Sequence, residues 1–254
     1  KRSQLADNLG IMATGNKGAP PCLSVWDKGE GQSPENFEST FLSVAKSNKV
    51  KVPFVQGKMN QGSTGCLSFS GPEHIKVILS KRNPAIKTTS ESDDWTFTVI
   101  RRLRPTDSER MSTYVYLAPN GSLPQFKGDS LPILPGEYPK YYGQDIDYGT
   151  FVKLYDYKIR GLNTIITLDF NNRMSSHLVS PPLPIKLYER RLGYNAHSYE
   201  ATMSGLEVRL EEDRNNNVEP NFPVSGQFSI DSETLNYSIT ALNREAPKKG
   251  RYKK

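Results

Sequence analysis

Six consecutive residues, DKGEGQ from Asp27 to Gln32, combine an acid with two alternating glycines. They follow the apolar run CLSVWD of residues 22–27, which is typical of a buried strand that ends on the acid. Asp27 could accept a hydrogen bond from an amino group, and Gly29 and Gly31 would let the backbone approach a flat ligand because they lack a Cβ atom. The same pattern is typical of a plain turn, so it indicates a binding site only together with other segments.

A second glycine-rich segment, QGKMNQGSTG, spans residues 56–65 and precedes an apolar run. Loops of this composition surround phosphates with backbone N–H groups. The spacing of Gly57 and Gly62 fits part of a Walker A motif, but Ser63 stands where that motif requires lysine. We therefore do not expect a P-loop NTPase, and the dinucleotide-binding spacing GxGxxG is missing as well.

A third segment is the step Tyr148-Gly149-Thr150, which opens the run TFVKLYDYKI of residues 150–159. The run predicts a strand, and Thr150 would place a hydroxyl group at its start. A Gly-Thr step is common at the start of strands, so it also carries little weight alone.

Other chemically capable residues form weaker patterns. The acids Asp93 and Asp94, and those of 211–213, could hold Mg²⁺, although exposed acidic turns look the same. Tyrosines at 138–142 could stack on bases or pack against a sheet. The histidines and cysteines lack the spacing of a zinc site, and two cysteines cannot build a disulfide framework, which predicts a reducing, cytoplasmic location.

Helices and strands must position these segments. Ser33, Pro34 and Glu35 form a helix start, and Phe37 and Phe41 then share one face at helical spacing. A second helix is expected over 161–178. Further strands are expected, besides 22–27 and 150–159, in CLSFSG (66–71), HIKVILSKR (74–82), WTFTVIRRL (95–103), TYVYLAP (113–119), VRLEED (208–213), GQFSI (226–230) and LNYSITALN (235–243), with a long irregular stretch over 118–148. This order of elements predicts an α+β fold rather than a doubly wound parallel sheet.

In this order and spacing, the three segments resemble the motifs of the GHKL or Bergerat-fold ATPases. DxGxGQ, an amphipathic helix, a Lys- and Gly-rich segment and a GT step opening a strand occur in sequence over roughly residues 20–190. The GKxNxGSTG loop and GTxVKLYxY strand are similar to those of bacterial heat-shock-chaperone-like ATP-binding proteins. The resemblance implies an α/β sandwich, a mixed sheet with helices on one face, over residues 1–190, and a second β-rich unit over 191–254.

The resemblance also implies an adenine-nucleotide site with ATP and Mg²⁺ as cofactors. Asp27 would bind the adenine amino group, Gly31 would pack beneath the base, and Thr150 would support Asp27. Residues 46–62 would form a mobile lid over the nucleotide. The nucleotide-binding residues implied are Asp27, Gly29, Gly31, Gly57, Lys58, Asn60, Gly62, Ser63, Thr64, Gly65 and Thr150.

One motif of the family is missing. GHKL proteins carry a Glu that activates water and an Asn that binds Mg²⁺ on an N-box helix before DxGxG, but the first 26 residues contain no ExxxN pattern. We expect that the sequence starts after this helix, so the catalytic residue and the metal ligand are not assigned.

Charge is distributed unevenly along the chain. The formal net charge is +6, and the tail 244–254 holds six basic residues and one acid. The tail could bind nucleic acid through phosphates, or it is a solvated end. No apolar run is long enough for a membrane span, and the start lacks the apolar region of a signal peptide, so no membrane contact is expected.

Two classes of function follow from the resemblance. The first is an ATP-binding, ATP-hydrolysing domain whose lid closure changes contacts with a second domain or a partner, including a second copy in a homodimer. The second is a non-catalytic interaction module that kept nucleotide binding. A nucleic-acid-associated ATPase of DNA repair or antiphage defence is compatible with the first.

Overall fold

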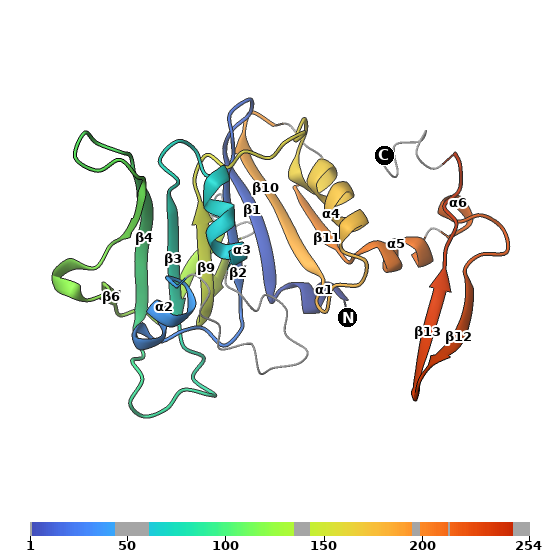
Figure 1. The fold of residues 1–254 in the computed structure, drawn as a ribbon, viewed down its shortest axis with the longest axis horizontal. Helices are drawn as coiled ribbons and strands as arrows, with labels where there is room; N and C mark the ends of the chain where they lie inside the picture. Colours follow the sequence, from blue (N-terminus) through green and yellow to red (C-terminus); the bar gives the residue numbers. More distant parts are fainter. Residues whose placement is uncertain (1, 44–60, 135–142, 195–198, 213, 246–254) are drawn as a thin grey trace.

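The computed structural model describes residues 2–43, 61–134, 143–194, 199–212 and 214–245. They form a mixed α+β fold whose main feature is a nine-stranded sheet with both parallel and antiparallel pairs (Figure 1). The strand order is β11-β10-β1-β2-β9-β3-β4-β5, and β6 also pairs with β4. The strands are β1 (Leu9–Asn16), β2 (Cys22–Asp27), β3 (Lys76–Lys81), β4 (Trp95–Leu103), β5 (Thr113–Tyr116), β6 (Gln125–Phe126), β9 (Gly149–Leu154), β10 (Ile185–Leu192) and β11 (Glu200–Met203).

Short helices and two small sheets complete the fold. The two small sheets pair β7 (Leu131–Leu134) with β8 (Gln144–Ile146) and β12 (Val224–Ile230) with β13 (Glu233–Ile239). The helices are α1 (Arg2–Ala6), α2 (Pro34–Thr40), α3 (Gln61–Gly65), α4 (Asn171–His177), α5 (Leu206–Glu212) and α6 (Arg214–Asn217), with the 3₁₀ turns η1 (Cys66–Phe69) and η2 (Pro119–Gly121) and the π-helical turn η3 (Ile166–Phe170).

The middle of the sheet joins segments that are far apart in the sequence. β1 and β2 form one hairpin and β3 and β4 form another, and β9 pairs antiparallel with both β2 and β3. β10 adds parallel to β1 on the other side. The central strands are therefore covered on both edges, and each can bury side chains on both faces.

Apolar side chains cover both faces of this sheet. On one face, Met12, Trp26 and Trp95 pack with Ile133 and Ile146 of the β7–β8 sheet. On the opposite face, two further clusters bring the helices onto the sheet. One contains Phe37, Leu67, Ile78 and Ile100, and the other contains Ala13, Leu23, Leu154 and Ile166.

The predicted start of α2 is confirmed. Ser33 occupies the N-cap position with extended backbone, Pro34 is the first helical residue, and Glu35 lies in the first turn. The Ser33 hydroxyl accepts from Asn36 Nδ2 at 3.1 Å instead of capping a backbone N–H. Phe37 is fully buried against the sheet, so this helix is held by one deeply inserted aromatic ring.

Two predicted elements are wrong. The expected strand over 66–71 begins with the 3₁₀ turn η1, because β4 and β9 already occupy both edges of β3. The expected strand over 208–213 falls largely in α5, whose N–H groups at Leu206 and Glu207 donate to carbonyls of 178 and 179. Alternation over so few charged residues does not separate helix from strand.

The other expected elements are confirmed, two strands with the expected bounds, at 22–27 and 95–103, and the others with shifted bounds. The helix expected from 161 begins only at 166, with a π-helical turn that continues into α4. The strand expected over 150–159 ends at Leu154, shortly before Asp156 adopts φ +47°. The irregular stretch 118–148 contains the short strands β6, β7 and β8.

The C-terminal hairpin differs from the main sheet in what it buries. Its register places Val224 opposite Ile239 and Phe228 opposite Leu235 on one face, and only Ser, Thr, Gln and Asn side chains on the other face of these pairs. The apolar face is exposed, with Ile239 at 56% and Phe228 at 45%. Figure 1 shows the hairpin lying apart from the nine-stranded sheet.

The boundary expected after residue 190 falls within β10, and β11 extends the same sheet to Met203. The division of the chain into two units stays a prediction.

Candidate functional site

A row of polar side chains crosses four neighbouring strands of the sheet. Asp27 at the end of β2 lies opposite Thr150 of β9, Thr150 lies opposite Ser80 of β3, and Ser80 lies opposite Thr96 of β4. Directly opposed residues in antiparallel strands share a face. The face is the one that carries Ile78 and Leu154, and therefore the one covered by the helices.

The Asp27 carboxylate is oriented by the loop that follows it. Its Oδ1 accepts from the Gly29 N–H at 2.9 Å. A Cβ atom at position 29 would lie 2.6 Å from this oxygen, so a larger residue would push the carboxylate aside. The conformation of the Asp27 carboxylate therefore requires glycine at position 29, and this conformation would also suit a bound ligand.

Ser80 connects the loop, the row and the start of β9. Its hydroxyl donates to Gly149 O at 2.8 Å and accepts from the Gln32 N–H at 2.9 Å. Its oxygen also lies 3.1 Å from Thr150 Oγ1. Because the single Ser80 proton is used at Gly149, Thr150 is the donor in this contact. The Thr150 oxygen then presents acceptor capacity beside the Asp27 carboxylate.

Two glycines let the backbone segments at this end of the sheet come close. Gly31 has φ +63°, and a Cβ atom there would lie 1.8 Å from Lys81 O. Gly149 has φ +111°, and its Cβ would lie 2.0 Å from Asp27 O. Both positions therefore require glycine for packing of the loop and of β9 against their neighbours.

The glycine segment is described only in its second half. Gly57, Lys58 and Asn60, and residues 46–60 of the expected lid, lie outside the described residues. Gly62, Ser63, Thr64 and Gly65 belong to α3. A Cβ atom at Gly62 or Gly65 would meet nothing within 4 Å, so packing does not demand glycine at these two positions.

Ser63 contacts a buried lysine. Lys76 Nζ, on a residue only 1% exposed, donates to Ser63 O and to Ser63 Oγ, each at 2.9 Å. Burial lowers the pKa of Lys76. The Cys66 thiol lies beside it and also donates to Ser63 O, at 3.0 Å, and burial raises the pKa of Cys66, which keeps the thiol protonated.

The charge of Lys76 is not balanced by an acid in the part of the chain that the structure describes. None of the ion pairs among the described residues includes Lys76. An ammonium group that is buried without a counter-ion is costly, and it favours an anion nearby.

The structure therefore gathers Asp27, Gly29, Gly31 and Thr150 at one end of β2 and β9. It places Ser63 elsewhere on the same face, against Lys76, which precedes Ser80 by four residues on β3. At about 3.3 Å per residue, the two parts of the face are roughly 13 Å apart.

Ser80 and Lys76 were missed by the sequence reasoning. Both alternate with Ile78 in the expected strand 74–82, so they share its face. The sequence evidence for them was their spacing of two residues on either side of Ile78, which places all three side chains on one face of a strand. This spacing points to a site only when it is known that β9 and β4 flank β3.

The remaining candidates lie elsewhere. Asp93 forms an ion pair with Lys87 at 3.2 Å, and Glu212 forms one with Arg2 at 2.7 Å. Residues 138–142 lie outside the described ranges. Across the described part of the chain, no three His, Cys, Asp or Glu side chains are placed to hold a metal ion together.

Comparison with known proteins does not assign this chain to a family. No protein-family model matches this chain, and no curated protein matches it. Among the described residues, no helix combines the length and apolar character that crossing a membrane requires.

Proposed function

We propose that the chain binds an adenine nucleotide on the helix-covered face of the sheet, in the manner of a Bergerat-fold ATPase. The observation that carries the proposal is the row formed by Asp27, Thr150 and Ser80, with a buried cation on the same face. A carboxylate and a hydroxyl oxygen side by side form a pair of acceptors.

This pair of acceptors suits an exocyclic amino group, which brings two N–H donors. Asp27 supplies the charged acceptor, held by the Gly29 N–H, and Thr150 supplies the neutral one, held by Ser80. Hydrogen bonds to a charged group contribute more than neutral ones, so Asp27 is the stronger partner.

The position of Lys76 suits the other end of such a ligand. It lies roughly 13 Å along β3 from the row, a separation comparable with that between the amino group and the phosphates of an adenine nucleotide. Its uncompensated charge favours phosphate near Ser63. The roles of Gly57, Lys58, Asn60, Gly62, Thr64 and Gly65 at the phosphates, and lid closure over 46–62, are part of the same proposal.

ATP hydrolysis and Mg²⁺ rest on the family resemblance. Bound Mg²⁺ would neutralise phosphate charge, as it does in other nucleotide sites. A binding module without hydrolysis remains the alternative function, and release of phosphate from ATP by the purified chain distinguishes the two. Dimer formation on ATP binding and nucleic-acid binding by the tail 244–254 are separate proposals.

Calorimetric titration with ATP and ADP tests the site. Asp27→Asn keeps the shape of the side chain but removes its charge, and we expect a loss of about 1–3 kcal/mol in binding free energy. Asp231→Asn is the matched control, because this acid lies in the exposed turn between β12 and β13 at φ +52°, a conformation that asparagine tolerates.

Thermal unfolding shows whether each variant is folded. Equal nucleotide affinity for the wild type, the Asp27 variant and the control contradicts the assignment of Asp27. Absence of any ATP or ADP binding by the folded wild type contradicts the proposal as a whole.

A further inference from the structure

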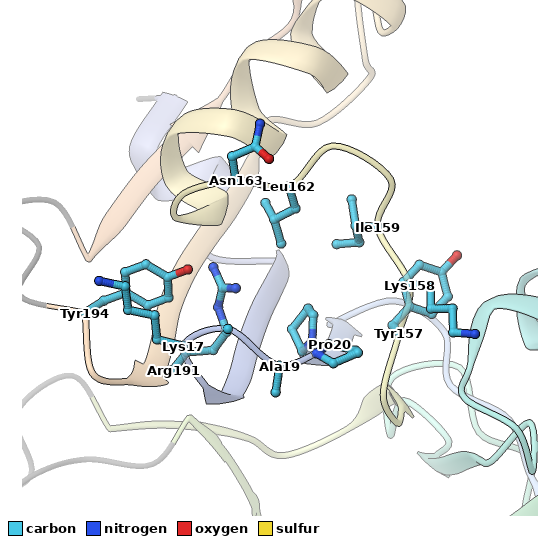
Figure 2. Close-up of a pocket in the computed structure, with 12 residues that line it drawn as sticks. Lys17, Ala19, Pro20, Tyr157, Lys158, Ile159, Leu162, Asn163, Arg191 and Tyr194 are labelled. Carbon is cyan, nitrogen blue, oxygen red and sulfur yellow. The ribbon is translucent and has the colours of Figure 1, made fainter.

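A second candidate site is a cavity at the opposite end of the same strands. Its volume is about 420 Å³, and its walls come from the turn between β1 and β2, the segment after β9 and the end of β10 (Figure 2). Asp27 lies at the other end of β2, five residues from Cys22, which is roughly 17 Å of strand. The cavity is therefore separate from the polar row.

Hydrogen bonds between its walls hold the cavity open. The Lys17 N–H donates to Leu192 O at 2.9 Å, and the Tyr157 N–H donates to Pro21 O at 2.7 Å. The Arg191 guanidinium donates from NH2 to Thr164 O at 2.9 Å. The three walls are thus fixed to one another by the fold itself, so a ligand would lose little affinity to ordering them.

Arg191 is a fixed part of one wall. Its Nε and NH2 donate to the Glu189 carboxylate at 2.8 and 2.7 Å, and Glu189 is fully buried. Burial alone would lower the pKa of Arg191, but the hydrogen bonds and the charge of Glu189 raise it. The ion pair balances the charge of Arg191 and keeps its guanidinium in place beside the Tyr194 ring, 4.6 Å from the ring centre.

Two lysines add positive charge on opposite sides of the cavity. Lys17 lies on the side of Arg191 and Tyr194, and Lys158 lies on the side of Tyr157 (Figure 2). Both are exposed, and neither forms an ion pair with a described residue. The Lys17 ammonium lies over the Tyr194 ring, 5.3 Å from its centre. The flexible stems of both lysines would let the ammonium groups turn toward a ligand at the mouth. No acid is among the described residues that line the cavity.

The rest of the lining is mainly apolar, with Asn163 as a polar exception. Pro20 and Leu162 lie between the two charged sides (Figure 2), and Pro21 and Tyr157 also line the cavity. Such a lining favours a ligand with a flat or apolar body, and a volume of about 420 Å³ lies within the range of small-molecule sites. An inorganic anion alone would not pack against this apolar wall.

We propose that this cavity binds a small organic anion in which a flat, apolar body carries a carboxylate or a phosphate ester. The body packs against Pro20, Pro21 and Leu162, and the anionic group lies at the mouth between Lys17 and Lys158. This site does not depend on nucleotide binding at Asp27.

A matched set of naphthalene compounds distinguishes the contribution of the flat ring system to affinity from that of the negative charge. Titration calorimetry of the full chain with 1-naphthoate, 1-naphthyl phosphate and neutral 1-naphthamide compares a carboxylate, a phosphate ester and an uncharged analogue of the carboxylate. Wild type is expected to bind at least one anion about tenfold more tightly than the amide, and the tighter anion identifies the preferred group. Inorganic phosphate alone is expected to bind about tenfold more weakly than the naphthyl ester.

The double variant Lys17→Gln/Lys158→Gln is expected to weaken anion binding about fivefold, because exposed charges each contribute modestly, and to leave amide binding unchanged. Lys127→Gln/Arg110→Gln, at exposed sites away from the cavity, is the control with the same loss of charge. Equal affinities for anions and amide in the wild type, or anion binding that the cavity variant and the control reduce equally, would overturn the proposal.

Discussion

The nine-stranded sheet and the β12–β13 hairpin both contain strands that alternate polar and apolar residues, such as β4 and β12, yet the two regions use the alternation differently. Ile78 on β3 is fully buried, whereas Ile239 on β13 is 56% exposed. The first is covered by Phe37 of α2 and Leu67 of η1, and the hairpin face has no such cover among the described residues. Alternation therefore determines which side chains share a face, and only packing against another layer makes that face a core.

The same contrast applies to polar groups. The hairpin places Ser225 opposite Ser238 on a face open to water, where an exposed hydroxyl group loses little solvation free energy. The main sheet encloses Ser80, Thr96, Lys76 and Glu189, so each of these groups needs a partner inside the protein. Pairs of equivalent substitutions in the two regions measure this difference.

The largest difference is expected for phenylalanine. Phe37→Ala removes a fully buried ring, and we expect the free energy of unfolding to fall by about 3–5 kcal/mol. Phe228→Ala in the hairpin, where the ring is 45% exposed, should change it by about 0.5 kcal/mol. Urea titrations of both variants provide the measurement, and equal losses would show that the hairpin face is covered in solution.

A somewhat smaller difference is expected for glutamate. Glu189→Gln leaves Arg191 buried without a carboxylate, and we expect a loss of about 3 kcal/mol in unfolding free energy. Glu233→Gln, at the exposed end of the hairpin, should stay within about 0.5 kcal/mol. The two values come from the same urea titrations, and a small loss at Glu189 would mean that water reaches Arg191.

The next effect depends on pH. Burial lowers the pKa of Lys76 in the folded state, so the unfolded chain holds the proton more tightly. The contribution of Lys76 to stability therefore rises with pH from the lowered pKa up to the ordinary value of about 10.4. Urea titrations from pH 7 to 9.5 should show this rise in the wild type and a weaker rise in Lys76→Met. Parallel curves would contradict a buried ammonium group at neutral pH.

The smallest effect is expected for threonine. The Thr96 hydroxyl is buried, and none of the described groups accepts or donates a hydrogen bond to it. Thr96→Val should therefore raise the free energy of unfolding by about 1 kcal/mol, whereas Thr234→Val on the polar hairpin face should leave it nearly unchanged. A loss of stability in Thr96→Val, measured by thermal unfolding, would reveal a partner for this hydroxyl.

Local patterns predicted the sheet better than the helices. Strands with clear alternation, such as β2, β3 and β4, lie where expected, and Ser33-Pro34-Glu35 correctly marks the start of α2. Residues 66–71 were assigned to a strand because their composition suits one, but no edge of β3 was open to them. Pattern alone does not show which sheet edges are available.

The candidate site was predictable only in part for the same reason. Asp27, Gly31 and Thr150 stand out in the sequence, and the sheet does bring them together. Ser80 and Lys76 look ordinary in the run HIKVILSKR, and their importance arises from the strands that flank β3. Ser80 pairs with Thr150, 70 residues away, and Lys76 with Leu154, farther still, so no local pattern reveals these partners.

The position of β9 between β2 and β3 also has a consequence for folding during synthesis. Each of the hairpins β1–β2 and β3–β4 can close locally, but the two meet only through β9, whose residues follow those of β4 by more than forty positions. In a chain growing from its N-terminus, the facing edges of β2 and β3 therefore stay unpaired until residue 154 has emerged from the ribosome, and the polar row does not exist before then. Such late, long-range pairing slows folding and exposes the nascent chain to aggregation, so we expect β9 to insert late and chaperones to assist this step during synthesis.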